Sequence, residues 1–133
     1  EALAAVQQDG HRLNDVTEGL KADREVVLAA VKTSGQALQY ADASLKGDRS
    51  IVVAALQRNG FALQHVPVEL KRDREVLLAA VNREGQSLRY VPEEFKMDRE
   101  IALAAVRQDS FALNFCPEDL LVDSTFATEV KKG

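Results

Sequence analysis

Apolar and polar positions follow a pattern that repeats every 25 residues. Six consecutive apolar residues, with a pair of alanines near their end, occupy 26–31, 51–56, 76–81 and 101–106. A helix that buries only one face shows a narrower apolar stripe than this. Each run therefore predicts a helix of about 11 residues, roughly 16 Å long, that is packed on several sides.

Start and stop signals flank each apolar run. An aspartate three residues before it recurs at 23, 48, 73, 98 and 123, where its carboxylate suits a helix N-cap. Glutamate follows in the first turn at 25, 75 and 100, where the helix dipole favours negative charge. Glycine recurs after each helix at 10, 35, 60 and 85, with Ser110 in the same position. We expect these glycines to end the helices in the left-handed conformation.

The second half of each unit has shorter apolar segments. In "QSLRYVPEEFKM" (86–97), apolar residues stand at 88, 90, 91 and 95, and proline recurs at 67, 92 and 117. Proline starts a helix well but does not continue one. We expect a short helix over about 86–91 and then a one-turn helix at "PEEF". Alternatively "SLRYV" is a short strand, which would give a leucine-rich-repeat-like horseshoe.

Stacked copies of such a unit bury one another's apolar faces. The sequence therefore predicts an all-α fold, an α-solenoid of 25-residue helical repeats. The expected units are a truncated 1–22, then 23–47, 48–72, 73–97, 98–122 and a C-terminal cap at 123–133. Because the chain begins in mid-pattern, we expect it to be a fragment of a longer protein. In the cap, Thr128, Glu129 and Lys131 replace Leu103, Ala104 and Val106, so we expect those three apolar positions to face the following repeat.

The repeated motif resembles a known family. The pattern LKxDRExVLAAVxxxGxAL is closest in "DREVVLAAVKTSGQALQYA" and "DREVLLAAVNREGQSLRYV". It is similar to an uncharacterised tandem helical-repeat family that is catalogued only as a domain of unknown function. That family is found mainly in single-celled eukaryotes and some intracellular bacteria. The resemblance covers the whole chain and implies helical repeats within larger proteins. It carries no established catalytic residues.

Composition narrows the function classes. The net charge of −4 gives no general attraction to nucleic acid or to an anionic membrane. No apolar run approaches the ~18 residues of a transmembrane helix. One cysteine excludes an internal disulfide and suits a reducing environment. We therefore expect an intracellular protein, in a compartment that the sequence does not identify.

The residues that most often carry chemistry do not form a motif. His11 and His65, the two histidines, occupy different positions of the repeat and have no neighbour at ligand spacing. Cys116 stands in an apolar position shared with Val66 and Val91, which favours a buried side chain. A regular repeat without a unique polar cluster argues against an enzyme. We expect no catalytic residues, no metal site and no cofactor.

Two columns of the repeat are candidate binding surfaces. In the first, each lysine stands three residues before an arginine; stacking would align them into a basic stripe that could bind an acidic partner. The aspartate column lies in the same strip, so a salt-bridged face that holds the repeats in register is the simpler interpretation. The stripe comprises Lys21, Arg24, Lys46, Arg49, Lys71, Arg74, Lys96 and Arg99.

The second column varies between units and is rich in aromatic residues. Such a column on a regular scaffold is typical of a binding face, although half-buried packing of the short helix is the simpler explanation. Its members are Tyr40, His65, Tyr90 and Phe115. The sequence thus favours a non-catalytic scaffold or protein–protein interaction module, whose partners are proteins or other domains of the parent chain. The alternative is a binder of nucleic acid, acidic protein or phospholipid through the basic stripe.

Overall fold

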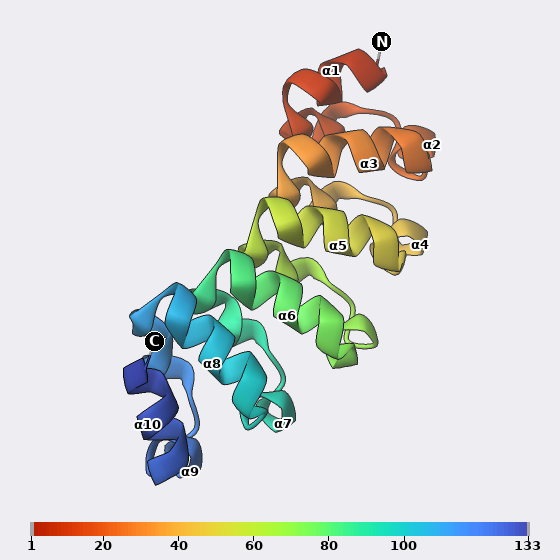
Figure 1. Cartoon of the computed structure of the whole chain (residues 1–133). Helices are drawn as coiled ribbons and strands as arrows, with labels where there is room; N and C mark the ends of the chain where they lie inside the picture. The colour runs from red at the N-terminus through yellow and green to blue at the C-terminus, as the bar shows by residue number, and fades with distance from the viewer. Residues whose placement is uncertain (1, 133) are drawn as a thin grey trace.

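The computed structural model describes residues 2–132, which form an elongated stack of helices (Figure 1). One long helix per unit lies side by side with the next, and the helices rotate progressively along the stack. The long helices are α1 (Ala2–Gln8), α3 (Arg24–Thr33), α5 (Arg49–Arg58), α6 (Arg74–Arg83), α8 (Arg99–Gln108) and α10 (Ser124–Lys132).

Each long helix leads into a 3-10 helix and then into a short helical turn. The 3-10 helices are η1 (Gly10–Asp15), η2 (Gly35–Tyr40), η3 (Gly60–His65), η5 (Gly85–Tyr90) and η6 (Ser110–Phe115). The short turns are α2 (Glu18–Lys21), α4 (Ala43–Lys46), η4 (Leu70–Arg72), α7 (Glu93–Lys96) and α9 (Glu118–Leu121).

The prediction of an all-α solenoid is confirmed. Residues 2–132 contain no strand, and "SLRYV" lies in η5 and the residue after it, so the horseshoe alternative is wrong. The expected helix over 86–91 is a 3-10 helix, and the one-turn helix follows it as α7. In the part of the chain that the structure describes, no helix is long and apolar enough to cross a membrane.

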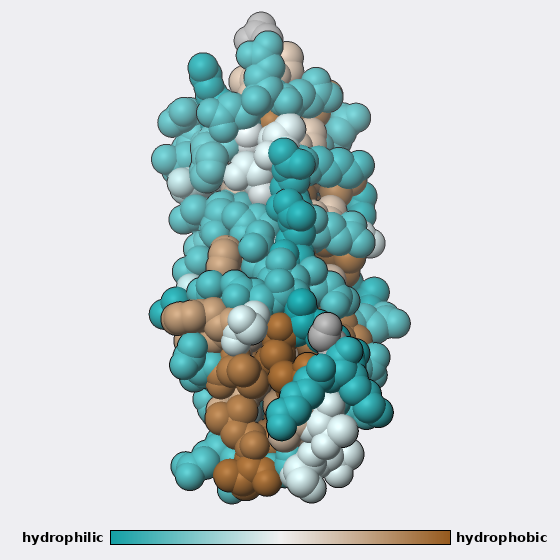
Figure 2. Space-filling view, turned by 60° about the vertical axis from the view of Figure 1, so that its left-hand side comes forward, coloured by the Kyte–Doolittle hydropathy of each residue, from teal (hydrophilic) through white to brown (hydrophobic). Residues whose placement is uncertain are grey.

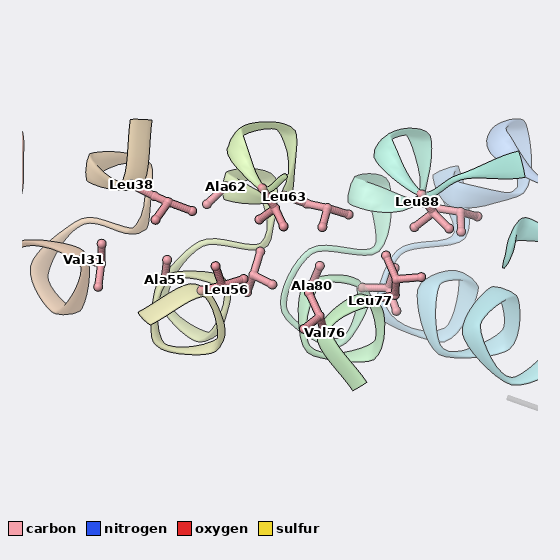
Figure 3. Packing of buried hydrophobic residues seen from close by; sticks show 14 of the residues in the cluster. Val31, Leu38, Ala55, Leu56, Ala62, Leu63, Val76, Leu77, Ala80 and Leu88 are labelled. Atoms are coloured by element: carbon pink, nitrogen blue, oxygen red, sulfur yellow. The ribbon is translucent and has the colours of Figure 1, made fainter. Parts of the chain in front are cut away.

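The core is a continuous double row of buried side chains (Figure 3). Leucines from the 3-10 helices, Leu38, Leu63 and Leu88, face the long helices, from which Ala55 and Ala80 are fully buried. The helices α3, α5, α6 and α8 each pack both on neighbouring long helices and on the 3-10 helices of their own and the preceding unit. This explains why the apolar run of the sequence is continuous, since one helix is covered on several sides.

The glycines do not act as predicted. Among residues 2–132 no glycine has a positive φ, so the expectation of a left-handed helix end is wrong. Instead, a Cβ added to Gly60 would lie 2.3 Å from the carbonyl oxygen of Ala80 in the next long helix. The equivalent distance is 2.3 Å for Gly35 to the Ala55 oxygen and 2.2 Å for Gly85 to the Ala105 oxygen. Glycine is therefore required because the next unit comes too close for any side chain.

The last junction differs in this respect. Ser110 takes the glycine position between α8 and α10, and its side chain is exposed. Every earlier long helix from α3 onward packs on the preceding 3-10 helix, but α10 packs mainly on α8 and α9 and lacks comparable packing on η6. A serine Cβ does not fit an approach as close as that seen at the glycines, which agrees with the looser packing of α10 on η6.

We predict that Gly60→Ala destabilises the array. The added Cβ meets backbone and side chain of the next unit, and overpacking of this kind costs about 1–3 kcal/mol. Urea unfolding followed by circular dichroism measures the change. Gly47→Ala is the matched control, because a Cβ at Gly47 meets nothing within 4 Å and its φ of −94° suits alanine. Equal stability of the two variants would contradict the close-approach explanation.

Candidate binding surfaces

The aspartate column forms the start of every complete long helix. Asp73 Oδ1 accepts hydrogen bonds from the backbone N–H of Glu75 at 3.0 Å and of Val76 at 3.3 Å. Asp48 and Asp98 cap α5 and α8 in the same way. One carboxylate oxygen thus satisfies two free backbone donors at each helix start, as the sequence predicts.

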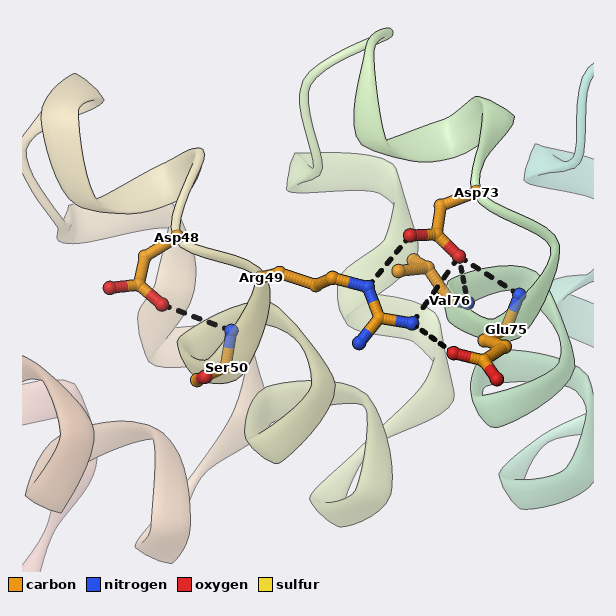
Figure 4. A network of polar contacts seen from close by, with 6 residues as sticks. All are labelled: Asp48, Arg49, Ser50, Asp73, Glu75 and Val76. Atoms are coloured by element: carbon orange, nitrogen blue, oxygen red, sulfur yellow. Dashed lines mark hydrogen bonds and ion pairs between the residues drawn. The ribbon is translucent and has the colours of Figure 1, made fainter.

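The second oxygen of the same aspartates binds an arginine of the preceding unit. Arg49 Nε donates to Asp73 Oδ2 at 2.7 Å, while its Nη2 donates to Glu75 (Figure 4). Arg74 repeats this arrangement one unit later with Asp98, at 2.8 Å, and with Glu100. At the two ends of the series Arg24 binds Asp48 at 3.0 Å and Arg99 binds Asp123 at 3.1 Å. The arginines thus join consecutive units in a ladder of charge-assisted hydrogen bonds.

The arginine contacts of this ladder lower the pKa of its aspartate carboxyl groups. The hydrogen bond from Arg49 holds the pKa of Asp73 below its usual value, and Arg74 does the same to the pKa of Asp98. The arginine charges of the stripe are therefore matched within the array. The contacts agree with the salt-bridged interpretation of the arginine column.

The lysines of the stripe lie apart from the ladder and are half-buried. Lys21 pairs with Glu18 at 3.3 Å and Lys96 pairs with Glu93 at 3.0 Å, and their side chains are only 17% and 12% exposed. Lys46 and Lys71 have Ala43 and Val68 at the position of those glutamates. Neither of these two lysines forms an ion pair with any of residues 2–132. The stripe thus divides into paired and unpaired cations.

The aromatic column is half-buried against the core. The rings of Tyr40, Tyr90 and Phe115 all pack on the buried cluster. The Arg89 guanidinium lies 5.5 Å from the centre of the Tyr90 ring and 5.6 Å from that of Phe115, so it lies between successive members of the column. His65 Nε2 lies 2.8 Å from Gln36 Oε1 of the preceding unit.

The other residues that could carry chemistry, His11 and Cys116, are in contact with neighbouring residues of the array. His11 Nε2 lies 3.0 Å from Ser34 Oγ, and its ring meets Tyr40 edge to face. Cys116 is buried, and burial raises the pKa of its thiol, which disfavours the reactive thiolate. Within residues 2–132, no three metal-ligating side chains gather at one place.

An open groove lies between α6 and α8. Its volume is about 750 Å³, and its floor is formed by Leu78, Leu103 and Ala104. Glu100 stands at the edge near the starts of the helices, and Arg107 stands at the edge near their ends. A smaller groove of about 290 Å³ between α1 and α3 repeats this arrangement, with Leu28 in its floor.

The groove corrects one prediction and adds residues that sequence reasoning missed. Leu103 and Ala104 were expected to face the following repeat, but they lie half-buried beside Leu78 of the preceding helix. Two buried faces already account for four of the six apolar residues of the run, Ile101, Ala102, Ala105 and Val106. The two residues in the middle of the run point to a third, open side. The run has more apolar residues than two buried faces require, and this surplus was the sequence signal that could have revealed the groove.

A second apolar hollow lies at the C-terminal end. Figure 2 shows the largest hydrophobic area of that view over the last unit. A pocket of about 190 Å³ there is lined by Leu113, Leu121, Phe126, Ala127, Val130 and Lys131. Leu113 is partly exposed, whereas the equivalent Leu88 is fully buried, because η5 is covered by η6.

Comparison with protein families gives three matches in tandem. The family described as Domain of unknown function (DUF4116) matches residues 2–46, 23–71 and 73–121. The chain belongs to this family. The resemblance noted from the repeated motif is thereby confirmed, and DUF4116 repeats in this chain form an α-solenoid. Neither the comparison with curated proteins nor that with solved structures gave a match.

We predict that Asp98→Asn and Asp98→Ala separate the two roles of the aspartate. Asparagine still caps the helix but loses the charge that Arg74 binds, whereas alanine loses both. Asp98→Ala should therefore be less stable than Asp98→Asn by about 1 kcal/mol, the usual contribution of an N-cap. In 1 M salt the contribution of the Arg74–Asp98 charge pair to stability should decrease, because salt screens it, whereas the contribution of the N-cap should not. Identical urea midpoints for the two variants would contradict a capping role.

We also predict a loss of stability in acid. The pKa values of Asp48, Asp73 and Asp98 are lowered in the folded state, chiefly by hydrogen bonds from arginine, and that of Asp123 chiefly by the Phe126 N–H. Their contribution is present above the unfolded value of about 3.9 and is lost as pH falls through the lower folded values. Thermal unfolding between pH 6 and pH 2 measures the effect. A double variant with Asp73→Asn and Asp98→Asn should show a shallower decline, and an unchanged decline would refute the assignment.

Proposed function

We propose that this array is a non-catalytic protein-interaction module, and that the groove between α6 and α8 is its binding site. The observation that carries the proposal is the apolar floor of Leu78, Leu103 and Ala104, which the neighbouring units leave open. Hollows of this size with an apolar floor and a few polar residues at the edge are typical binding sites.

The partner that fits is an amphipathic helix that lies antiparallel to α6 and α8. A groove between two parallel helices accepts the apolar side of a third helix. Antiparallel docking opposes the helix dipoles. It also brings the acidic first turn of the partner near Arg107 and its basic last turn near Glu100, in addition to the contacts that these residues make with Glu129 and Arg74. Leucines at positions i, i+4 and i+7 of the partner would lie on the floor.

The basic stripe is a less suitable binding surface than the groove. Its four arginines are engaged by aspartates of the following units. An anionic partner would have to displace contacts that also hold the units together. The apolar floor has no such competing contact, so we favour the groove.

A selection from a library of displayed helical peptides tests this proposal. We expect enriched peptides with an apolar i, i+4, i+7 stripe, an acidic start and a basic end. Their affinity should lie in the micromolar range, about 1–100 µM, because one helix covers only a small interface. Fluorescence anisotropy with a labelled peptide measures it.

Leu103→Arg should weaken the selected peptides at least about tenfold, because it places a charge on the apolar floor. Val122→Arg is the matched control, since Val122 is 73% exposed and lies outside the groove. Circular dichroism verifies that both variants fold. Equal binding by both variants, or no enrichment of such peptides, would overturn the proposal.

A further inference from the structure

The smaller groove, between α1 and α3, is built from the same positions of the repeat as the groove between α6 and α8. Its floor is formed by Leu3, Leu28 and Ala29, all of which are half-buried. These residues stand three repeat units before the floor residues of the larger groove. The same apolar surface is therefore open at two places along the array.

The charged edges of the two grooves correspond as well. Glu25 lies in the first turn of α3 and Lys32 lies in its last turn, and both line the smaller groove. Their equivalents in the larger groove are Glu100 and Arg107. Each groove thus presents an acid near the helix starts and a base near the helix ends. Both therefore suit the same amphipathic helix in the same antiparallel direction.

The two intermediate pairs of helices do not have both charges. Where α3 and α8 carry Lys32 and Arg107, α5 carries Gln57 and α6 carries Asn82, which are uncharged. Helix α5 also has Ser50 at the position of the glutamate, whereas α6 keeps the acid but not the base. The charges therefore distinguish the first and the last of the four grooves between α1 and α8.

The base of the smaller groove also lacks the neighbour that engages Arg107. Arg107 Nη2 lies 3.7 Å from Glu129 Oε2 of the following unit. Ala54 stands at the equivalent position in the unit after Lys32, and the Lys32 side chain is exposed. The positive charge of Lys32 is therefore available to the acidic first turn of a docked helix.

We propose that the groove between α1 and α3 is a second, weaker site for the same class of helix, so that the array binds two amphipathic helices of one partner. This inference rests on the proposed function of the larger groove. The smaller hollow has a volume of about 290 Å³ against about 750 Å³, so we expect binding at least about tenfold weaker there. At about 8–10 Å between packed helices, three steps separate the sites by roughly 24–30 Å.

An NMR titration of the full chain tests each site separately. The probe is a synthetic helical peptide with leucine at positions i, i+4 and i+7, glutamates in its first turn and lysines in its last turn. The backbone amide of Ala29 reports on the smaller groove and that of Ala104 on the larger one. We expect both amides to shift, with dissociation constants that differ at least about tenfold. Leu103→Arg should abolish the tighter binding and leave the weaker.

Leu28→Arg should abolish the response of Ala29 and leave that of Ala104 unchanged, because it charges only the floor of the smaller groove. Val53→Arg is the matched control, since Val53 holds the same position of the repeat and is also half-buried but lines neither groove. Lys32→Gln should weaken binding at Ala29 about two- to fivefold, as expected for an exposed charge pair. Circular dichroism verifies that the variants fold.

Two copies of the peptide in one ligand test whether both sites act together. A linker of about 30 glycine and serine residues has an r.m.s. span of roughly 30 Å. The linked ligand should bind the parent protein about three- to tenfold more tightly than the single peptide, because the linker holds the second helix at a millimolar effective concentration. Leu28→Arg should remove this gain and Val53→Arg should keep it.

The inference is overturned if Ala29 does not respond to the peptide, or if Leu28→Arg and Val53→Arg have the same effect. Equal affinity of the linked and the single ligand would overturn the two-helix partner. The two proposals fail separately. A response of Ala104 without one of Ala29 contradicts only the second site, whereas a response of Ala29 alone contradicts the groove between α6 and α8.

Discussion

The structure depends on the close approach of one backbone to the next at the junctions that carry glycine. A carbonyl oxygen of α3, α5, α6 and α8 lies where a side chain of the preceding 3-10 helix would otherwise stand, as at Gly60 and Ala80. This approach brings leucines such as Leu63 into full burial against the next helix. A single unit has no such partner, so its stability comes from its neighbours. The 25-residue spacing of the sequence is the spacing of these junctions.

Electrostatic contacts act at the same junctions. Asp48, Asp73 and Asp98 each cap their own helix with one oxygen and bind an arginine of the unit before with the other, as Asp73 does with Arg49. The ion pair is exposed and individually weak. Its geometry nonetheless links the start of one helix to the start of the next. Because the arginines are used at the junctions, the surface that we propose for binding is the apolar groove between α6 and α8.

The sequence predicted the architecture because the pattern repeats in five or more copies. The caps, the long helices and the one-turn helices all follow from local rules that apply to Asp73 as they do to Asp98. The role of the glycines was not predictable locally, since a left-handed helix end and a close approach both require glycine. Only the position of the Ala80 carbonyl distinguishes them.

The candidate surfaces were predicted less well for a related reason. The arginine and lysine columns look equivalent in sequence, yet the arginines reach the next unit and the lysines do not. The floor residues Leu78 and Leu103 belong to an uninterrupted apolar run, which hides their open side.

Hydrogen exchange resolved along the chain, compared between the parent protein and Ser110→Gly, tests the role of the junction most directly. Glycine at 110 removes the Cβ and so permits the close approach seen at Gly60. The account predicts that α10 amides exchange more slowly in the variant, while those of α5 do not change. Unchanged exchange in α10 would show that the close approach does not control how tightly one unit packs on the next.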